Sequence, residues 1–62
     1  MDKLMTLIDV SKELGVSRMT VYRLVRVKAI DSYRVGSQYR VSRYQLDKYL
    51  AENRVKANGN GQ

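Results

Sequence analysis

The sequence contains no cysteine and no histidine among its 62 residues. Without cysteine the fold cannot be held by disulfides or by thiolate-bound zinc, and without histidine the remaining common zinc motifs are excluded as well. Small domains often rely on such cross-links, because a chain of this length hides only about 60% of the surface that its unfolded form exposes. We therefore expect one marginally stable domain, without metal or cofactor, whose working state gains stability from a bound partner.

Acidic residues are also scarce. Six Asp and Glu stand against twelve Lys and Arg, which gives a net charge of +6. On so small a surface this excess favours a polyanion partner over an acidic membrane face. No apolar run approaches the roughly 20 residues that span a bilayer, and no signal-peptide core opens the chain. We expect a soluble, intracellular protein that does not bind membranes.

Reactive side chains are equally few. With no cysteine or histidine, and with carboxylates scattered along the chain, we find no nucleophile paired with a base and no plausible metal cluster. The sequence therefore predicts a binding protein and not an enzyme.

What the chain does contain is a helix stop followed at once by a helix start. Thr6 and Asp9 match a capping box that starts a helix over residues 7–14, and Gly15 ends this helix by taking the left-handed cap conformation. Ser17 then caps the next helix through its hydroxyl. A short turn with glycine between two helices is the geometry that presents the second helix to a DNA major groove.

The spacing of apolar residues predicts that this second helix runs from residue 18 to about 27, with Val21, Leu24 and Val25 as its core stripe. The opposite face holds no acid and carries these side chains: Arg18, Met19, Tyr22, Arg23 and Arg26. A solubilising face would mix the signs of its charges, so we interpret this face as one that contacts DNA. Arginine can bond both O6 and N7 of guanine, and methionine can pack on a thymine methyl. The first amides of the helix, with the Ser17 hydroxyl, can hold a phosphate.

Residues 30–41 change to a period of two, which predicts a β-hairpin. A two-residue type II′ turn at 36–37 suits the local sequence, but it would pair Arg34 with Tyr39. A three-residue loop at 36–38 pairs Val35 with Tyr39 instead. We prefer the three-residue loop, because burial of the apolar side chains should outweigh the turn preference.

The preferred register sets Arg34 opposite Arg40, an unfavourable pair of like charges that indicates a phosphate nearby. Both arginines would clamp phosphates from the outer face of the hairpin. The tip is small and polar, so it can follow the DNA backbone or enter a minor groove; its residues are Gly36, Ser37 and Gln38.

A capping box at Ser42 and Gln45 starts a third helix, which ends near Asn53. Its expected buried stripe consists of Leu46, Tyr49 and Leu50. Beyond it the apolar pattern stops, so we divide the chain into a domain over 1–53 and a flexible C-terminal tail over 54–62.

The tyrosines leave two interpretations open. Tyr22 either contacts phosphate or covers the hairpin. The others are better explained as core and rim packing than as platforms for single-stranded bases, although aromatic side chains on a basic strand can stack in that way. These residues are Tyr33, Tyr39, Tyr44 and Tyr49.

The order helix, turn, helix, hairpin, helix predicts a mostly helical α+β fold, a small winged helix-turn-helix. Residues 5–50 resemble the excisionase-type, MerR-like winged helix-turn-helix domains of phage, plasmid and transposon proteins. The resemblance is carried by Met5-Thr6, Leu14-Gly15-Val16-Ser17, Thr20-Val21-Tyr22-Arg23, Val35-Gly36, Tyr39-Arg40-Val41 and Leu46 to Leu50. It implies base contacts at Met19, Tyr22, Arg23 and Arg26, and wing contacts around Gln38.

The chain departs from the family pattern at residues 28–31, where glycine and proline are often found before the wing. MerR-type regulators also carry a long dimerisation helix and an effector domain, so the resemblance favours the small excisionases, or recombination directionality factors. It implies cooperative binding to double-stranded attachment-site DNA, DNA bending, and an integrase partner that is directed toward excision. Such a protein would act at the nucleoid, in the cytoplasm of a bacterial host cell.

Two other functions remain open. A small transcriptional regulator of a phage, plasmid or transposon would use the same DNA-binding surface, and the sequence does not separate it from an excisionase. An RNA or single-strand binding module is a more distant alternative, which the tyrosine-rich hairpin keeps in view.

Overall fold

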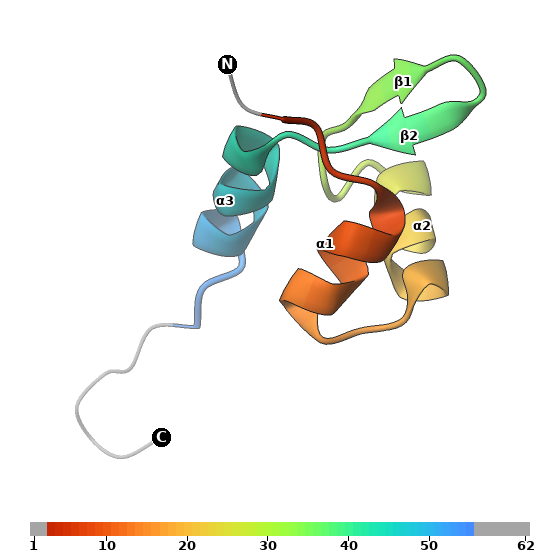
Figure 1. Ribbon diagram of the computed structural model, residues 1–62. Helices are drawn as coiled ribbons and strands as arrows, with labels where there is room; N and C mark the ends of the chain where they lie inside the picture. The colour runs from red at the N-terminus through yellow and green to blue at the C-terminus, as the bar shows by residue number, and fades with distance from the viewer. Residues whose placement is uncertain (1–2, 56–62) are drawn as a thin grey trace, which may run out of the picture.

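The computed structural model describes residues 3–55, which form three helices and a hairpin (Figure 1). The elements are, in order, α1 (Leu7–Leu14), α2 (Arg18–Arg26), β1 (Tyr33–Val35), β2 (Gln38–Arg40) and α3 (Arg43–Glu52). This is the winged helix-turn-helix fold predicted from the sequence. None of the described helices has the length and apolar composition that crossing a bilayer requires. Of the expected tail, residues 56–62 lie outside the described part of the chain.

The caps of α1 and α3 confirm the predicted capping boxes. Thr6 Oγ1 accepts the N–H of Asp9 at 3.0 Å, and the Asp9 carboxylate accepts the N–H of Thr6 at 3.1 Å. Ser42 and Gln45 form the same reciprocal pair on α3, at 3.0 and 2.9 Å. Gly15, with a φ of 72°, ends α1 in the left-handed conformation as expected. These short polar patterns set the helix boundaries because each pair satisfies backbone amides that the helix itself leaves open.

The end of α2 uses a lysine where glycine is usual. Lys28 has a φ of 62° and lies just beyond the last helical residue, Arg26. Its N–H donates to the Val25 carbonyl at 3.1 Å, and the N–H of Ala29 donates to the Leu24 carbonyl at 2.9 Å. These are the two hydrogen bonds of a Schellman motif. The departure from the family pattern at 28–31 therefore replaces the glycine but keeps the turn.

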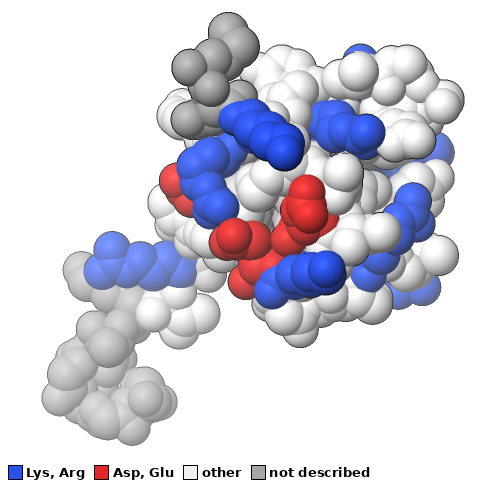
Figure 2. Space-filling view, in the orientation of Figure 1, with Lys and Arg blue, Asp and Glu red and all other residues white. Residues whose placement is uncertain are grey.

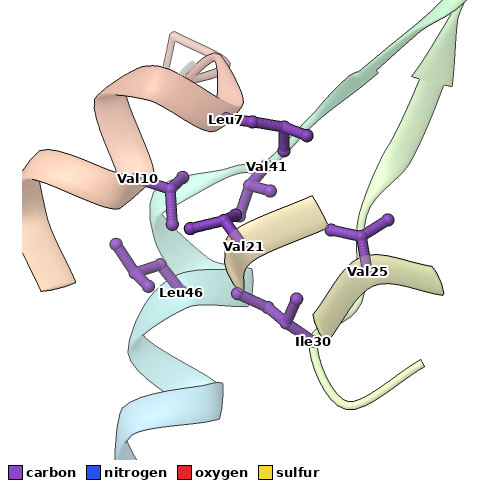
Figure 3. Close-up of a cluster of buried hydrophobic side chains, with 7 residues drawn as sticks. All are labelled: Leu7, Val10, Val21, Val25, Ile30, Val41 and Leu46. Carbon is purple, nitrogen blue, oxygen red and sulfur yellow. The ribbon is translucent and has the colours of Figure 1, made fainter. Parts of the chain in front are cut away.

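The core is a cluster of aliphatic side chains that draws on all three helices and the segments around the hairpin (Figure 3). Its members are Leu7, Val10, Val21, Val25, Ile30, Val41 and Leu46. Among the described residues of α3, Leu46 is the one that is fully buried. The expectation that Leu50 is buried is wrong, since its side chain is 46% exposed. Leu50 lies one helical turn beyond Leu46, past the edge of the cluster.

The hairpin adopts the register that we did not prefer. The paired residues are Tyr33 with Arg40, Arg34 with Tyr39, and Val35 with Gln38. The loop is therefore the two-residue turn at 36–37, and the positive φ of 62° at Gly36 fits type II′. The three-residue prediction assumed an apolar face to bury, but Tyr33 and Val35 are 52% and 51% exposed. With so little burial at stake, the turn chemistry decides the register.

This register also removes one argument for phosphate. Arg34 and Arg40 do not face each other across the strands, so the predicted repulsion between them is absent. It therefore gives no reason to expect a phosphate nearby. Opposed residues share a face of the sheet, and neighbouring residues of a strand point to opposite faces. Arg34 therefore shares a face with Tyr39, and Arg40 shares the other face with Tyr33. The prediction that both arginines lie on one outer face is wrong. Arg40 instead donates to the Gln38 amide oxygen at 2.8 Å and to the Tyr39 carbonyl at 3.1 Å.

Polar contacts join the hairpin and α3 to the rest of the fold. Met5 and Val41 exchange two backbone hydrogen bonds, at 2.8 and 2.9 Å, which tie the base of the hairpin to the chain just before α1. Arg43 of α3 bonds the Glu13 carboxylate of α1 at 3.0 Å. The first contact fixes the base of the hairpin beside the start of α1, and the hairpin lies next to α2 (Figure 1).

Candidate nucleic-acid interface

A groove lies between α2 and the hairpin, and the start of α1 completes its wall. It is lined by Thr6, Leu7, Ile8, Arg18, Tyr22, Arg26, Arg34, Ser37, Gln38, Tyr39 and Arg40. We call it the arginine groove, because four arginines and no carboxylate line it. Positive charges that converge in a concave surface raise the local concentration of anions there. The groove is therefore suited to a polyanion.

The expected contact face of α2 divides into two adjacent stripes. Arg18, Tyr22 and Arg26 follow one another at intervals of four residues, and this stripe lines the groove. Met19 and Arg23 lie outside the groove lining on the next stripe, where both are exposed. The first stripe faces the hairpin, whereas the second points away from the core.

The N-terminal end of α2 carries an uncompensated positive dipole. Ser17 accepts the N–H of Thr20 at 3.1 Å, as predicted for the cap, and the two hydroxyl oxygens are 3.0 Å apart. The first turn of α2 contains no acidic side chain. Because the free amides of a helix start attract anions, this end adds to the positive field of the groove beside Arg18.

The wing contributes most of its expected site residues to the same groove. Arg34, Ser37, Gln38 and Arg40 all line it, whereas Gly36 occupies the exposed tip outside the lining. The hydrogen bond from Arg40 to the Gln38 side chain fixes both groups at the groove wall.

Two aromatic rings connect the walls of the groove. The centroids of Tyr22 and Tyr39 are 6.1 Å apart, and the rings meet edge to face at 63°. The guanidinium carbon of Arg26 lies 5.9 Å from the Tyr22 centroid, and that of Arg34 lies 5.1 Å from the Tyr39 centroid. Tyr22 therefore packs against the hairpin and also lines the groove, so its contact with phosphate stays a prediction. Tyr33 and Tyr44 are exposed, in contrast, and do not pack in the core.

Sequence reasoning left four groove residues out of the site. Thr6, Leu7 and Ile8 come from the start of α1, and nothing in their local pattern marks them as site residues. Tyr39 was detectable, because the two-residue turn that we set aside places it opposite Arg34. Its role in the groove follows from the register.

The acidic side chains lie elsewhere. In the space-filling view they gather over α1 and α3, among lysines and arginines, while the edge along α2 shows basic side chains (Figure 2). Three ion pairs engage carboxylates: Arg43 with Glu13, Arg43 with Asp47, and Lys48 with Asp31. The paired carboxylates raise the pKa of both cations. None of these bridges includes an arginine of the groove, so within residues 3–55 the groove charge is not neutralised.

The described residues contain no group of three or more His, Cys, Asp or Glu side chains that could hold a metal ion. What the site offers is a dense set of cationic hydrogen-bond donors. A planar guanidinium can bond a phosphate or the paired acceptors of a guanine with two N–H groups at once.

Comparisons with known proteins add one finding. A family model described as a helix-turn-helix domain matches residues 4–54, a span that includes both helices of the turn, the hairpin and α3. The family binds DNA and includes excisionase-like proteins. Searches of curated proteins and of solved structures found no match.

Proposed function

The chain belongs to this family of DNA-binding helix-turn-helix domains, and from that premise we propose that it binds double-stranded DNA with α2 and the hairpin. The observation that carries the proposal is the arginine groove, in which both elements contribute arginines and no carboxylate offsets them. A surface that only kept the protein in solution would not gather like charges in a concavity.

The two stripes of α2 support a division of labour. Met19 and Arg23 are exposed on the outward stripe, where they can reach base edges in the major groove. Arg26 and the wing arginines line the concavity, where they can hold the phosphates of a strand that passes between helix and wing. Base contacts would set the sequence preference, and phosphate contacts would supply most of the salt-dependent affinity.

We further propose that the DNA is an attachment site and that the protein acts as an excisionase. Several copies would bind neighbouring sites cooperatively, bend the DNA and direct an integrase toward excision. The support is the resemblance of residues 5–50 to excisionase-type domains, together with a contact surface too small to read many base pairs alone. Neutralising phosphates along one side of the duplex can offset a bending cost of about a few kcal/mol. The role is one of binding, with no reaction catalysed.

The first test measures affinity by fluorescence anisotropy for duplexes selected from a random library, a scrambled duplex, single strands and RNA. We expect tight binding to the selected duplex alone. Arg40→Ala should flatten the plot of log affinity against log salt by about one unit, because one phosphate contact is lost. Lys12→Ala, which removes a charge on α1 outside the groove, is the matched control. Equal or tighter binding to single strands, or an unchanged slope in Arg40→Ala, would contradict the proposed interface.

The second test addresses the excisionase role. A candidate integrase is supplied together with a plasmid that carries the attachment sites of that integrase, and excision is scored with and without the protein. We expect excision to require the protein and to fail with Arg23→Ala. If the protein binds duplex DNA but excision is indifferent to it, the role is that of a transcriptional regulator.

A further inference from the structure

We infer that Tyr22 and Tyr39 act as positioning residues, which hold Arg26 and Arg34 on opposite walls of the groove at a fixed separation. This inference rests on the proposed binding of duplex DNA. It gives both tyrosines a part in recognition that requires no contact between their rings and the nucleic acid.

The four side chains form a continuous ladder from α2 to β1. Its spacings are 5.9 Å from the Arg26 guanidinium to the Tyr22 ring, 6.1 Å between the rings, and 5.1 Å from the Tyr39 ring to the Arg34 guanidinium. Each cation lies within about 6 Å of a ring centroid, the range in which cation–π attraction operates. The edge-to-face angle of 63° between the rings is also a favourable aromatic geometry.

Local structure places each pair in contact. Arg26 follows Tyr22 by four residues on α2, so the two side chains are neighbours on the helix surface. Arg34 and Tyr39 oppose each other in the hairpin register and therefore share a face of the sheet. The contact between the two rings then joins the helix to the wing.

An aromatic support suits a phosphate-binding arginine better than a carboxylate does. A carboxylate would fix the guanidinium but would also cancel its charge. A ring fixes its direction and leaves the N–H edge and the full charge available. Elsewhere in residues 3–55 the chain does use carboxylates to hold cations, as for Arg43 and Lys48, but the groove holds none.

The working part of each tyrosine is its ring. Within the described residues neither hydroxyl is a buried group that needs a partner. Phenylalanine should therefore replace tyrosine at both positions, whereas leucine fills similar space without a π face.

The test is a double-mutant cycle on duplex affinity in the full 62-residue chain. Tyr39→Leu should lower affinity about two- to fivefold, the worth of an exposed cation–π contact, and should flatten the salt dependence. In an Arg34→Ala background the same substitution should change affinity little, because the arginine that it positions is gone. Tyr39→Phe should keep wild-type affinity and salt dependence. An equal loss from Tyr39→Leu in both backgrounds means a merely structural role and overturns the inference.

The second cycle repeats this with Tyr22→Leu and Arg26→Ala, and the same outcomes apply. If a leucine variant fails to fold, the chain is short enough for chemical synthesis with pentafluorophenylalanine in place of Tyr39. That side chain keeps the shape of the ring but reverses its attraction for cations. It should lower affinity as leucine does, and wild-type affinity would contradict the inference.

A measurement without DNA separates this inference from the proposed function. In the free protein the Tyr39 ring should shift the side-chain methylene protons of Arg34 upfield in NMR spectra, and Tyr39→Leu should abolish the shift while Tyr39→Phe keeps it. Unshifted methylene protons in the wild type would show that Arg34 does not stack on Tyr39, and would contradict the inference. If the ladder is present but the wild type binds no duplex, the proposed function fails instead.

Discussion

At the scale of single residues, the left-handed backbone of Lys28 is a local cost that the fold accepts. The conformation is uncomfortable for a residue with a Cβ and is the reason that glycine usually ends helices. The surrounding hydrogen bonds to Val25 and Leu24 hold it in place. Lys28 is exposed, and its strain can be relieved by substitution without disturbing the core.

Lys28→Gly should raise the free energy of unfolding by about 0.5–1 kcal/mol, because glycine adopts this φ without strain and loses only part of the gain to a more flexible unfolded chain. Urea denaturation followed by circular dichroism measures the change. Lys28→Ala is the control, since it removes the same charge but keeps the Cβ. If both variants are equally stabilised, charge and not backbone strain is the cause.

Arg23 tests the outward stripe of α2. Arg23→Ala should cost about 1–3 kcal/mol of specific affinity and relax the preference at one base position, because Arg23 is exposed on the outward stripe, where a guanidinium can reach a base edge. Binding to a panel of single-base variants of the selected duplex gives both quantities. A uniform loss across the panel would instead make Arg23 a phosphate contact.

At the scale of elements, sequence patterns predicted the helix boundaries, which depend on residues close together in the chain. The caps at Thr6, Ser17 and Ser42 were predictable because each is a bond between residues only three apart in the chain. The register of the hairpin was not, because it depended on whether Tyr33 and Val35 would find a surface to cover. They do not, and the turn at 36–37 set the pairing instead.

The candidate site was predictable in composition but not in arrangement. The acid-free face of α2 identified Arg18, Arg23 and Arg26, and the hairpin supplied Arg34 and Arg40. The division of α2 into a groove stripe and an outward stripe depends on where the wing lies. That placement follows from tertiary contacts such as the pairing of residues 5 and 41. These residues are far apart in the sequence, so no local pattern predicts their contact.

The capping box of α1 should make the stability of the fold sensitive to acid. Hydrogen bonds from Thr6 lower the pKa of Asp9 below its ordinary value of 3.8. A carboxyl group with a lowered pKa in the folded state stabilises that state fully above its unfolded pKa, and the contribution is lost as the pH falls through the folded value. Wild-type stability should therefore decline as the pH drops below about 3.8.

The check is urea denaturation of wild type and Asp9→Asn on both sides of that pH. Asparagine can still accept the N–H of Thr6 but does not titrate, so its stability should fall less steeply with acid. The slope that remains in the variant belongs to the other carboxylates. Parallel curves for the two proteins would show that Asp9 contributes nothing to the acid response.

At the scale of the whole molecule, charge and packing are distributed unevenly. Three of the described carboxylates, on α1, on α3 and before β1, pair with Arg43 or Lys48, and the lining of the arginine groove contains no carboxylate. Packing is likewise uneven, since α1 and α2 form an extended contact whereas α3 enters the core through Leu46. The surface proposed to bind DNA is therefore supported by a small core, and a single substitution in that core can markedly lower the free energy of unfolding.

Leu46 is the residue on which the attachment of α3 depends. A domain of 62 residues has a total stability on the order of 3–9 kcal/mol. Leu46→Ala should remove about 2–5 kcal/mol of it, because the side chain is fully buried and leaves a cavity in the shared cluster. Leu50→Ala makes the same chemical change one turn away, at a side chain that is 46% exposed, and should alter stability by about 0.5 kcal/mol or less. Urea denaturation of both variants gives the comparison.

DNA should restore what Leu46→Ala removes. A ligand that binds the folded state alone adds about 2.7 kcal/mol of stability when its concentration is 100 times its dissociation constant. Circular dichroism of Leu46→Ala, titrated with the selected duplex, should therefore show a return of helical signal that the scrambled duplex does not produce. If Leu46→Ala loses no more stability than Leu50→Ala, α3 is held by its ion pairs and not by Leu46. If Leu46→Ala stays unfolded with saturating duplex, DNA binding is not coupled to the stability of the core.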